Sequence, residues 1–313
     1  MPTSGTNKRI IYFGNECIAT GVNSDAPILR MLLGNGYDVA AVVLNDNESR
    51  SRKLRHFAVE TIAVEHDIPV FKPHKIADIT PELVAFNAAI GVLVAFGQLI
   101  PQNIIDIFPW GIINVHPSLL PKHRGSTPIE STLLSGDPTT GVCLMLLSAT
   151  MDAGPLFDLS ELKLNGDESK LTLASALLNI GSDRLRQLLP GILNGEIKPV
   201  PQKEANATYD KRISKQDGVI DLQKPAVQLE REVRAYIGWP GSRTAIAGKD
   251  VVITAAHVAN NSLENVDNKA TFVADKQLCL QTADGILVVD TLIPAGKTAM
   301  PASAFLAGYG RLL

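Results

Sequence analysis

Two polar side chains that could take part in acyl or proton transfer lie two residues apart near the middle of the chain. Asn114 and His116 come at the end of an apolar run, residues 111–115, that is typical of a buried strand. Because side chains two apart in a strand lie on the same face, this amide and this imidazole can point at one place. A carboxylate, Asp152, follows a second apolar run over residues 141–148. Together these groups can stabilise an oxyanion and move a proton.

Spacing alone leaves a purely structural role open for each of these three residues, because an Asn, His or Asp near a strand end is commonly a cap or a turn residue. Three motifs, two of which include these residues, sharpen the interpretation. The run FGQLIP begins at Phe96, the run NVHPSLLP begins at Asn114, and Met151–Gly154 reads MDAG. In this order, the three motifs resemble the signature of the 10-formyltetrahydrofolate-dependent formyltransferases.

The resemblance implies acyl transfer from a folate to an amine, with a role for each polar residue. Asn114 would donate its amide N–H to the developing oxyanion, and His116 would face the same oxygen and serve in proton transfer. Asp152 would favour the charged imidazole by its proximity and take the proton of the amine, directly or through water. Such a direct transfer needs tight positioning, but it needs neither a metal nor a covalent enzyme intermediate.

The resemblance also implies where the co-substrate 10-formyltetrahydrofolate binds. The wall of its pterin pocket and a second folate-contacting loop would be formed by Phe96, Gly97, Leu99, Ile100, Ser118, Leu119, Leu120 and Pro121. Core packing is the alternative for the apolar members of this set. Arg124 is expected to be either an anion contact or a structural ion pair, and His123 is expected to be a solvated loop residue.

Bulk composition indicates a globular protein of about two domains. The chain has 313 residues, 45% of them hydrophobic, and a formal net charge of −3, so no global basic field attracts nucleic acid. Its three cysteines are scattered without a CxxC pair, which favours a reducing compartment and no cysteine-based zinc site. The polar start, MPTSGTNKR, lacks the apolar region of a signal peptide, and no apolar run is long enough for a membrane span. We expect a cytoplasmic monomer without membrane contact.

Apolar runs that alternate with amphipathic stretches predict an α/β fold, with a mostly parallel, Rossmann-like sheet covered by helices on both faces. The expected strands lie at residues 9–13, 38–44, around 70, 88–95, 111–115 and 141–148. Ligands on such sheets gather at the carboxyl ends of the strands, where Asn114 and His116 fall. The turn after the first strand reads GNEC from Gly14 and lacks the GxGxxG pattern, which disfavours a nicotinamide cofactor.

The rest of the chain divides into a helix, a linker and a small barrel. Apolar residues at helical spacing predict a long amphipathic helix over 171–193, and the proline-containing stretch 195–206 is typical of a linker. Short strands then predict a small OB-like β-barrel, with strands at 244–247, 251–256, 278–282 and 286–292. We therefore expect a formyltransferase catalytic domain over 1–194, a linker over 195–206 and a C-terminal β-barrel domain over 207–313.

The C-terminal part resembles the corresponding domain of the methionyl-tRNA branch of the same family, from Ala207 onward and again over residues 284–308. This resemblance implies that initiator methionyl-tRNA is the acceptor and that the C-terminal domain binds tRNA. Further phosphate contacts would come from a basic cluster that consists of Arg50, Arg52, Lys53 and Arg55. A solvated charged face is the alternative for this cluster.

Some departures from the family pattern leave other acceptors open. The turn after the first strand and the basic loop from Asn45 differ from the family's usual versions, and the C-terminal domain is balanced in charge. The acceptor could be an amino-sugar nucleotide. It could also be water, in which case the protein would be a folate hydrolase. A third alternative is a folate- or RNA-binding protein without catalytic activity. The C-terminal resemblance favours tRNA. The presence of Asn114, His116 and Asp152 together argues against a silent binding protein.

Overall fold

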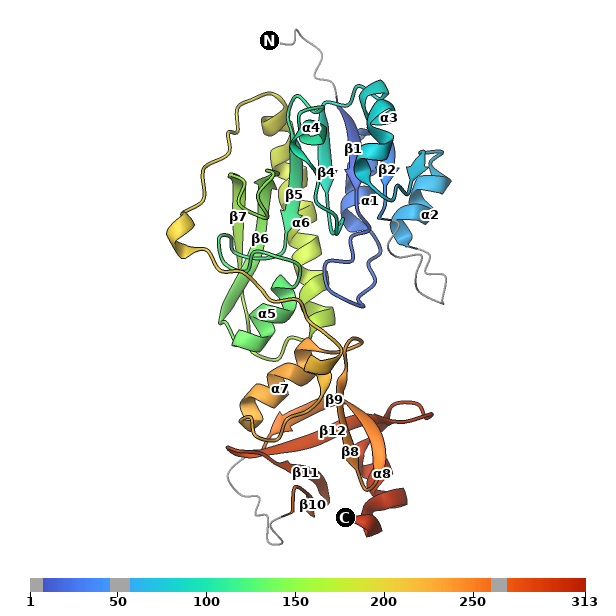
Figure 1. The fold of residues 1–313 in the computed structure, drawn as a ribbon, viewed down its shortest axis with the longest axis vertical. Helices are drawn as coiled ribbons and strands as arrows, with labels where there is room; N and C mark the ends of the chain where they lie inside the picture. Colours follow the sequence, from blue (N-terminus) through green and yellow to red (C-terminus); the bar gives the residue numbers. More distant parts are fainter. Residues whose placement is uncertain (1–7, 46–56, 260–268) are drawn as a thin grey trace. The chain divides into compact units, whose positions relative to one another are not determined.

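The computed structural model of the chain describes residues 8–45, 57–259 and 269–313. The described residues form two compact units, each with a hydrophobic core of its own (Figure 1). The first unit takes its residues from Met1–Ile129, Pro138–Leu164 and Thr172–Lys211, and the second from Glu130–Asp137, Asn165–Leu171 and Arg212–Leu313. The domain boundaries expected from the sequence, with a linker at 195–206, stay a prediction.

A seven-stranded sheet is the framework of the first unit. Across the sheet the strands follow the order β3 (Val70–Phe71), β2 (Asp38–Val43), β1 (Arg9–Phe13), β4 (Ile90–Leu93), β5 (Ile112–His116), β6 (Thr139–Leu146) and β7 (Leu156–Lys163). The first five strands pair in parallel, whereas β6 and β7 run antiparallel to their neighbours at one edge. The predicted mostly parallel α/β sheet is therefore confirmed.

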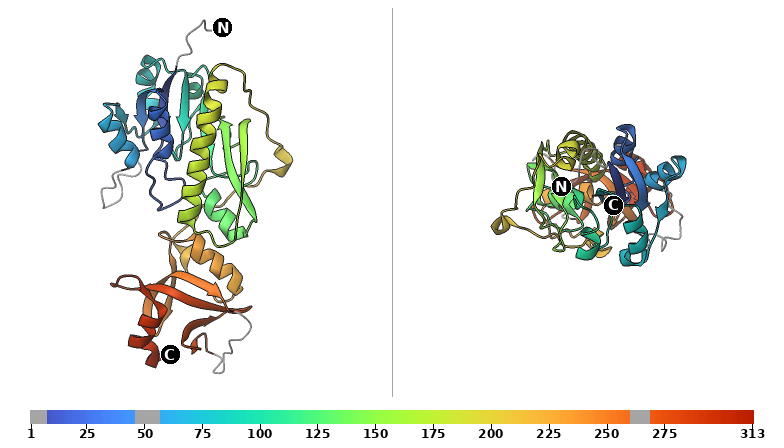
Figure 2. Two further views of the ribbon diagram at one scale, coloured as in Figure 1. Left: turned by 180° about the vertical axis from the view of Figure 1, so that it is seen from behind. Right: turned by 90° about the horizontal axis from the view of Figure 1, so that it is seen from above.

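Helices cover both faces of this sheet (Figure 2). The helices of the unit are α1 (Pro27–Gly34), α2 (Ala58–Glu65), α3 (Thr80–Ala85), α4 (Gln102–Ile105) and α6 (Lys170–Leu193). On one face α6 lies beside α1, where the hydroxyl of Ser182 donates to the carbonyl of Pro27 at 3.3 Å. A Cβ on Gly181 would lie only 2.6 Å from Cγ1 of Val115, so α6 also presses closely on β5. On the other face α3 and α4 pack around a core that contains Phe13.

The order of the strands marks the edge where this sheet is suited to bind a ligand. The chain moves outward from β1 to β3 and then crosses back to β4 and β5 on the other side of β1. Ligands of open α/β sheets bind at such a reversal, outside the carboxyl ends of the strands. The loop after β1 presses on the end of β4 there. Gly14 has a φ of +104°, and a Cβ at this position would lie 1.9 Å from the carbonyl oxygen of Val94, so only glycine fits.

The loop that follows Gly14 buries a carboxylate. Glu16 has no exposed surface, and it accepts hydrogen bonds from the hydroxyl of Tyr12 at 2.7 Å and from the backbone N–H groups of Ile28 and Leu29 at 3.1 and 2.9 Å. The two N–H groups belong to the first turn of α1, which lacks partners within the helix, so Glu16 caps α1. Burial raises the pKa of Glu16 to about 7, against the lowering effect of these three hydrogen bonds.

We expect the protein to lose stability between pH 4.5 and about 7 on account of Glu16. Its pKa in the folded state lies above the ordinary value of 4.5, so the folded state binds more protons in this window and stability falls as the pH rises. In Glu16→Gln this dependence should disappear, and the free energy of unfolding should gain up to ~3 kcal/mol relative to the wild type across the window. Urea unfolding at several pH values measures the difference. If the free energy of unfolding had the same pH dependence in both proteins, the prediction would be wrong. Glu65→Gln, at an exposed position on α2, is the control.

An antiparallel, curled sheet is the framework of the second unit. Its strands follow the order β10 (Thr271–Ala274), β11 (Gln277–Gln281), β12 (Ile286–Pro294), β9 (Lys249–Val258) and β8 (Ser242–Ile246), and β13 (Met300–Pro301) pairs with β12. Two helices, α7 (Ala226–Ala235) and α8 (Ala302–Tyr309), pack against it around a core that includes Leu229 and Phe305. This half-barrel confirms the expected OB-like class of the C-terminal part.

The second unit also contains two segments from the middle of the chain. One is most of α5 (Pro128–Ser135), and the other includes the first residue of α6. Lys170 and Glu130 join these segments, because both are fully buried and Nζ lies 3.7 Å from Oε1. Nζ of Lys170 also donates to the carbonyl of Trp239 at 2.7 Å. Burial lowers the pKa of Lys170, although the charge of Glu130 opposes this shift.

Most elements lie where the apolar patterns predict them. The long helix expected over 171–193 is α6, and each of the expected strands of both units is present within a few residues of its expected bounds. Among the strands, β7, β10 and β13 have no counterpart among the expectations, and among the helices the same is true of α3, α4, α5, α7 and α8. Among the helices of the described ranges, none is both long and apolar enough to cross a membrane.

Candidate active site

Strand β5 carries two of the three expected catalytic side chains. Asn114 and His116 lie on the same face of the strand and are buried, with 7% and 4% of their surface exposed. The strand is held between β4 and β6, where Asn114 pairs with Met145 and His116 with Cys143. A strand fixed on both sides leaves the two polar groups little freedom, as precise positioning of reacting groups requires.

The side-chain amide of Asn114 makes no hydrogen bond to any other residue that the structure describes. A primary amide offers two N–H donors, and buried donors normally have a partner within the protein. A donor that is held on a buried strand and has no partner among the described residues is the kind of group that an oxyanion site needs.

The hydrogen bond made by His116 determines which of its ring nitrogens is available for chemistry. Nε2 lies 3.0 Å from the carbonyl oxygen of His123, and because a carbonyl only accepts, Nε2 carries the proton of this bond. Nδ1 faces Asp152, 3.9 Å from Oδ1, which is too long for a hydrogen bond but close enough for charge attraction whenever the ring is protonated. The neutral ring thus presents an unprotonated nitrogen beside a carboxylate, as a proton carrier requires.

Asp152 lies in the turn between β6 and β7, and its backbone has a left-handed φ of +49°. Oδ2 accepts a hydrogen bond from the backbone N–H of Gly125 at 2.8 Å, and Oδ1 faces His116. A left-handed conformation is uncommon for residues other than glycine, although Asp tolerates it better than most, and the contacts of Asp152 support it in this conformation. The bond from Gly125 joins this turn to the loop that follows β5.

The loop after β5 is fixed by internal contacts. The hydroxyl of the fully buried Ser118 donates to the carbonyl of Lys122 at 2.7 Å, and Leu120 packs against Cys143. Burial raises the pKa of the Cys143 thiol to about 12, so the sulfur next to the site stays protonated and is a poor nucleophile. This state agrees with a transfer that has no covalent thiol intermediate.

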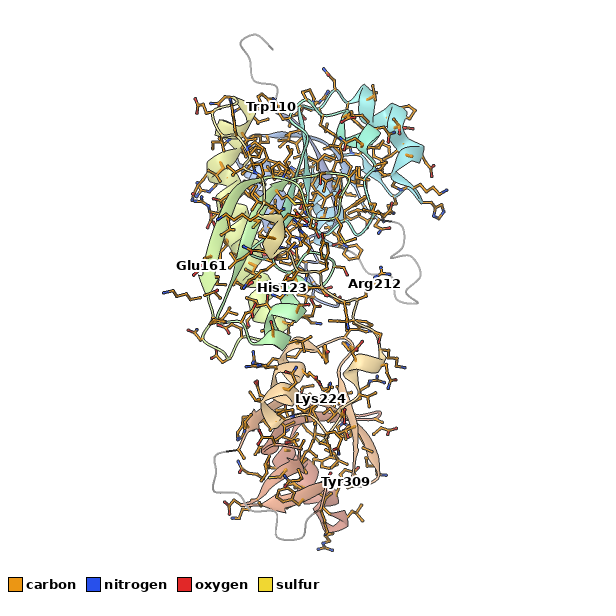
Figure 3. All side chains as sticks on the ribbon, turned by 60° about the vertical axis from the view of Figure 1, so that its left-hand side comes forward. Trp110, His123, Glu161, Arg212, Lys224 and Tyr309 are labelled. Carbon is orange, nitrogen blue, oxygen red and sulfur yellow. The ribbon has the colours of Figure 1, made fainter. Side chains whose placement is uncertain are left out.

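His123 is not the solvated loop residue that its sequence context indicates (Figure 3). Its side chain is 15% exposed, and Nδ1 lies 3.0 Å from Oδ1 of Asp210. Its backbone N–H donates to the hydroxyl of Thr208 at 2.9 Å. The expectation was wrong because the partner of His123 comes from a segment 87 residues later in the chain, and local composition carries no signal for such a contact.

Arg124, for which two roles were open, forms a structural ion pair. Its side chain is fully buried, and both terminal nitrogens donate to the carboxylate of Glu204 at 2.8 Å. Nη1 also donates to the hydroxyl of Tyr209, over whose ring the guanidinium lies at 5.5 Å. The hydrogen bonds to Glu204 are the main reason why the pKa of Arg124 lies above its ordinary value. A guanidinium held in this way serves the fold rather than a substrate anion.

The residues expected to bind the folate fall into a buried and an accessible group. The buried group consists of Phe96, Ile100, Ser118 and Leu120. Its apolar members pack in the protein interior, which agrees with the alternative that they are core residues. Those in the accessible group retain exposed surface: Gly97, Leu99, Leu119 and Pro121. The two loops that carry them follow the neighbouring strands β4 and β5 at their carboxyl ends. A folate contact by these residues stays a prediction.

Family models match both parts of the chain. The formyl transferase model matches residues 11–189, and the model of the formyl transferase C-terminal domain matches residues 212–310. The methionyl-tRNA formyltransferase of Roseiflexus castenholzii is 34% identical over 299 residues, which cover 94% of each chain. That of Pseudoalteromonas translucida is 33% identical over 306 residues, which cover 96% of this chain and 94% of the relative.

Solved structures share the fold at lower sequence identity. An N-formyltransferase from Helicobacter canadensis, in complex with folinic acid and dTDP-3-aminofucose, has a TM-score of 0.68 at 19% identity, over 90% of this chain and 98% of that one. HypX from Aquifex aeolicus, in complex with tetrahydrofolic acid, has a TM-score of 0.62 at 17% identity, over 96% of this chain. The present chain covers only 47% of HypX. At these identities the similarity shows the fold alone.

Proposed function

The chain belongs to the formyl transferase family, and from this membership we propose that it transfers the formyl group of 10-formyltetrahydrofolate to the free amino group of initiator methionyl-tRNA. The observation that carries the reaction type is the arrangement at the end of β5, with the Nδ1 of His116 facing the carboxylate of Asp152 and the amide of Asn114 on the same strand face. The acceptor is supported by relatives named methionyl-tRNA formyltransferase that align over 94% of this chain, including its C-terminal part.

The proposed transfer is a direct acyl transfer through a tetrahedral intermediate. The nitrogen lone pair of the methionyl amine attacks the formyl carbon, and the electrons of the C=O bond move onto the oxygen. When the oxyanion collapses, the bond from carbon to N10 of the folate breaks. The amine nitrogen loses a proton and N10 gains one, so the reaction needs a group that accepts a proton and a group that returns it.

The described residues suit these tasks. The amide N–H of Asn114 donates to the oxyanion, which exists only in the transition state and the intermediate. Asp152 accepts the proton of the amine, directly or through water, and Nδ1 of His116 carries protons beside it. The low exposure of Asn114 and His116 strengthens their interactions with a developing charge. The folate would lie along the loops after β4 and β5, with its pterin near Gly97 and Leu99.

The experiment that tests the proposal is formyl transfer from 10-formyltetrahydrofolate to initiator methionyl-tRNA, with formate release measured in a control without acceptor. We expect formyl-methionyl-tRNA to form and formate release to be negligible. Transfer to an amino-sugar nucleotide but not to the tRNA would identify the runner-up acceptor. Formate release without any acceptor would identify a folate hydrolase, and folate binding without turnover would identify a silent binding protein.

The basic cluster Arg50, Arg52, Lys53 and Arg55 lies outside the described residues, and we propose that it contacts tRNA phosphates. Changing Arg52 and Lys53 together to Ala should weaken tRNA binding. It should also reduce the slope of log affinity against log salt by roughly 1.4 to 1.8, because each lost phosphate contact removes about 0.7 to 0.9. Binding measured over a range of salt concentrations tests this.

The matched control for this cluster is a pair of exposed basic residues elsewhere in the chain. Arg186 and Lys198, changed together to Ala, remove the same formal charge. The slope should stay at the wild-type value in the control. An unchanged slope in the variant of the cluster would refute its contact with phosphates.

A further inference from the structure

One side-chain amide, that of Gln202, joins the turn of Asp152 to the buried Arg124. Its Nε2 donates to the carbonyl of Asp152 at 2.8 Å and to the carbonyl of Gly154 at 2.7 Å. Its Oε1 accepts a hydrogen bond from Nη2 of Arg124 at 2.9 Å. A primary amide has two N–H donors and one carbonyl acceptor, so every polar group of this side chain is engaged.

These bonds complete a ring of contacts around Asp152. Gly125, which follows Arg124 in the chain, donates its backbone N–H to Oδ2 of Asp152 at 2.8 Å. The carboxylate is therefore held through Gly125 and the backbone carbonyl through Gln202, and Arg124 connects the two. The guanidinium that closes the ring is itself fixed by the carboxylate of Glu204.

The ring holds a backbone conformation that is uncommon outside glycine. With a φ of +49°, Asp152 lies in the left-handed region, which Asp tolerates better than most residues but in which a side chain still crowds the backbone. The bond from Gln202 to the carbonyl of Asp152 opposes rotation out of this region. Such a rotation would carry Oδ1 away from its place 3.9 Å from Nδ1 of His116.

We propose that Gln202 is a positioning residue for formyl transfer. By donating to the carbonyls of Asp152 and Gly154, it keeps the carboxylate of Asp152 opposite the imidazole of His116. The inference rests on the proposed function, because it requires Asp152 to act in the transfer. The stretch 195–206, whose composition is typical of a linker, thereby becomes part of the scaffold of the site.

Two substitutions distinguish this role from mere anchoring of Arg124. Gln202→Glu keeps an oxygen acceptor for Arg124 and adds a charge to that bond, but it has no N–H group for the two carbonyls. Gln202→Ala removes both kinds of contact. If Gln202 only anchored Arg124, Gln202→Glu would behave like the wild type. If it positions Asp152, both variants are impaired.

The test measures formyl transfer to initiator methionyl-tRNA by the full chain. We expect kcat to fall by about tenfold or more in both variants, with the KM values for folate and tRNA within about threefold of the wild type, because reacting groups are misplaced while binding surfaces persist. The pH profile of kcat should also move towards that of Asp152→Asn. Gln187→Ala is the matched control, because this exposed glutamine also accepts a hydrogen bond from an arginine, at 2.8 Å from Nη1 of Arg184.

The variants also separate failure of this inference from failure of the proposed function. Wild-type kcat in Gln202→Glu, together with a slow Asp152→Asn, would overturn the positioning role and leave the function intact. Wild-type kcat in Asp152→Asn would overturn the role of Asp152 and the inference with it. Thermal unfolding checks that each variant is folded. Should Gln202→Ala unfold, Gln202→Glu, which keeps the contact with Arg124, carries the test.

Discussion

An Asn114→Ala variant should transfer formyl groups about a hundred to a thousand times more slowly than the wild type, the usual cost of removing one oxyanion donor. The amide of Asn114 is buried on β5, and within the described chain it has no other hydrogen-bond partner, so the substitution removes a donor without leaving a protein group unpaired. The backbone pairing of β5 with β4 and β6 does not depend on this side chain. Because the oxyanion develops only in the transition state, the loss should fall on kcat rather than on KM.

Single-turnover transfer from 10-formyltetrahydrofolate to initiator methionyl-tRNA measures this effect directly. Asn179→Ala, on the exposed side of α6, is a control with the same chemical change. It should keep the wild-type rate. If Asn114→Ala also kept that rate, its amide would not be an oxyanion donor.

Replacing His116 with Ala should cut turnover by roughly a hundredfold or more while folate binding largely survives. In the proposed transfer the ring carries protons through Nδ1, which faces Asp152, and its other nitrogen is held by the carbonyl of His123. Loss of the ring therefore removes the proposed proton carrier, and it leaves that carbonyl with only the long hydrogen bond from the hydroxyl of Ser118 at 3.5 Å. A modest loss of stability should accompany the loss of rate, since the carbonyl loses its better donor.

Separate measurements of turnover and of folate affinity distinguish the two effects. The folate dissociation constant should stay within about threefold of the wild type, because we propose that the folate binds along the loops after β4 and β5 rather than on the imidazole. His66→Ala, at the exposed end of α2, should leave both quantities unchanged. Near-normal turnover in His116→Ala would remove this residue from the mechanism.

The strands of the first unit were predictable because central strands of a parallel sheet are buried on both faces and read as continuous apolar runs. β1, β2, β4 and β5 all have this character. The period of two along β5 was also enough to place Asn114 and His116 on one face. These features are local, so a short stretch of sequence contains them.

The edge strand β7 was not predictable in the same way. Its residues alternate between half-buried and exposed, and it carries charged side chains such as Asp158 and Glu161. Asp158 is held by the guanidinium of Arg184 on α6 at 2.7 and 2.8 Å, a contact that only the fold creates. Although burial opposes it, this ion pair lowers the pKa of Asp158.

The support of the site from residues 202–210 was also beyond reach of the sequence pattern. Gln202 stands in the stretch 195–206, which is typical of a linker, and Asp210 stands in the stretch predicted to begin the C-terminal domain. They nevertheless bond to Asp152 and His123. These partners are separated by 50 and 87 positions. Periodicity reports which face of an element is buried, but it says nothing about which distant polar group will meet another.

Because the second unit is built from three separate stretches of the chain, exchanging a single stretch between relatives would divide it. The second unit includes two stretches that precede its main body in the sequence, and the buried pair Lys170 and Glu130 links them to the carbonyl of Trp239. A graft that began at Arg212 would supply that carbonyl without the ammonium group that it accepts from. The segment from Arg212 onward therefore cannot be transferred on its own with its packing intact. Recombination that preserves both cores has to carry α5 and the start of α6 together with the barrel.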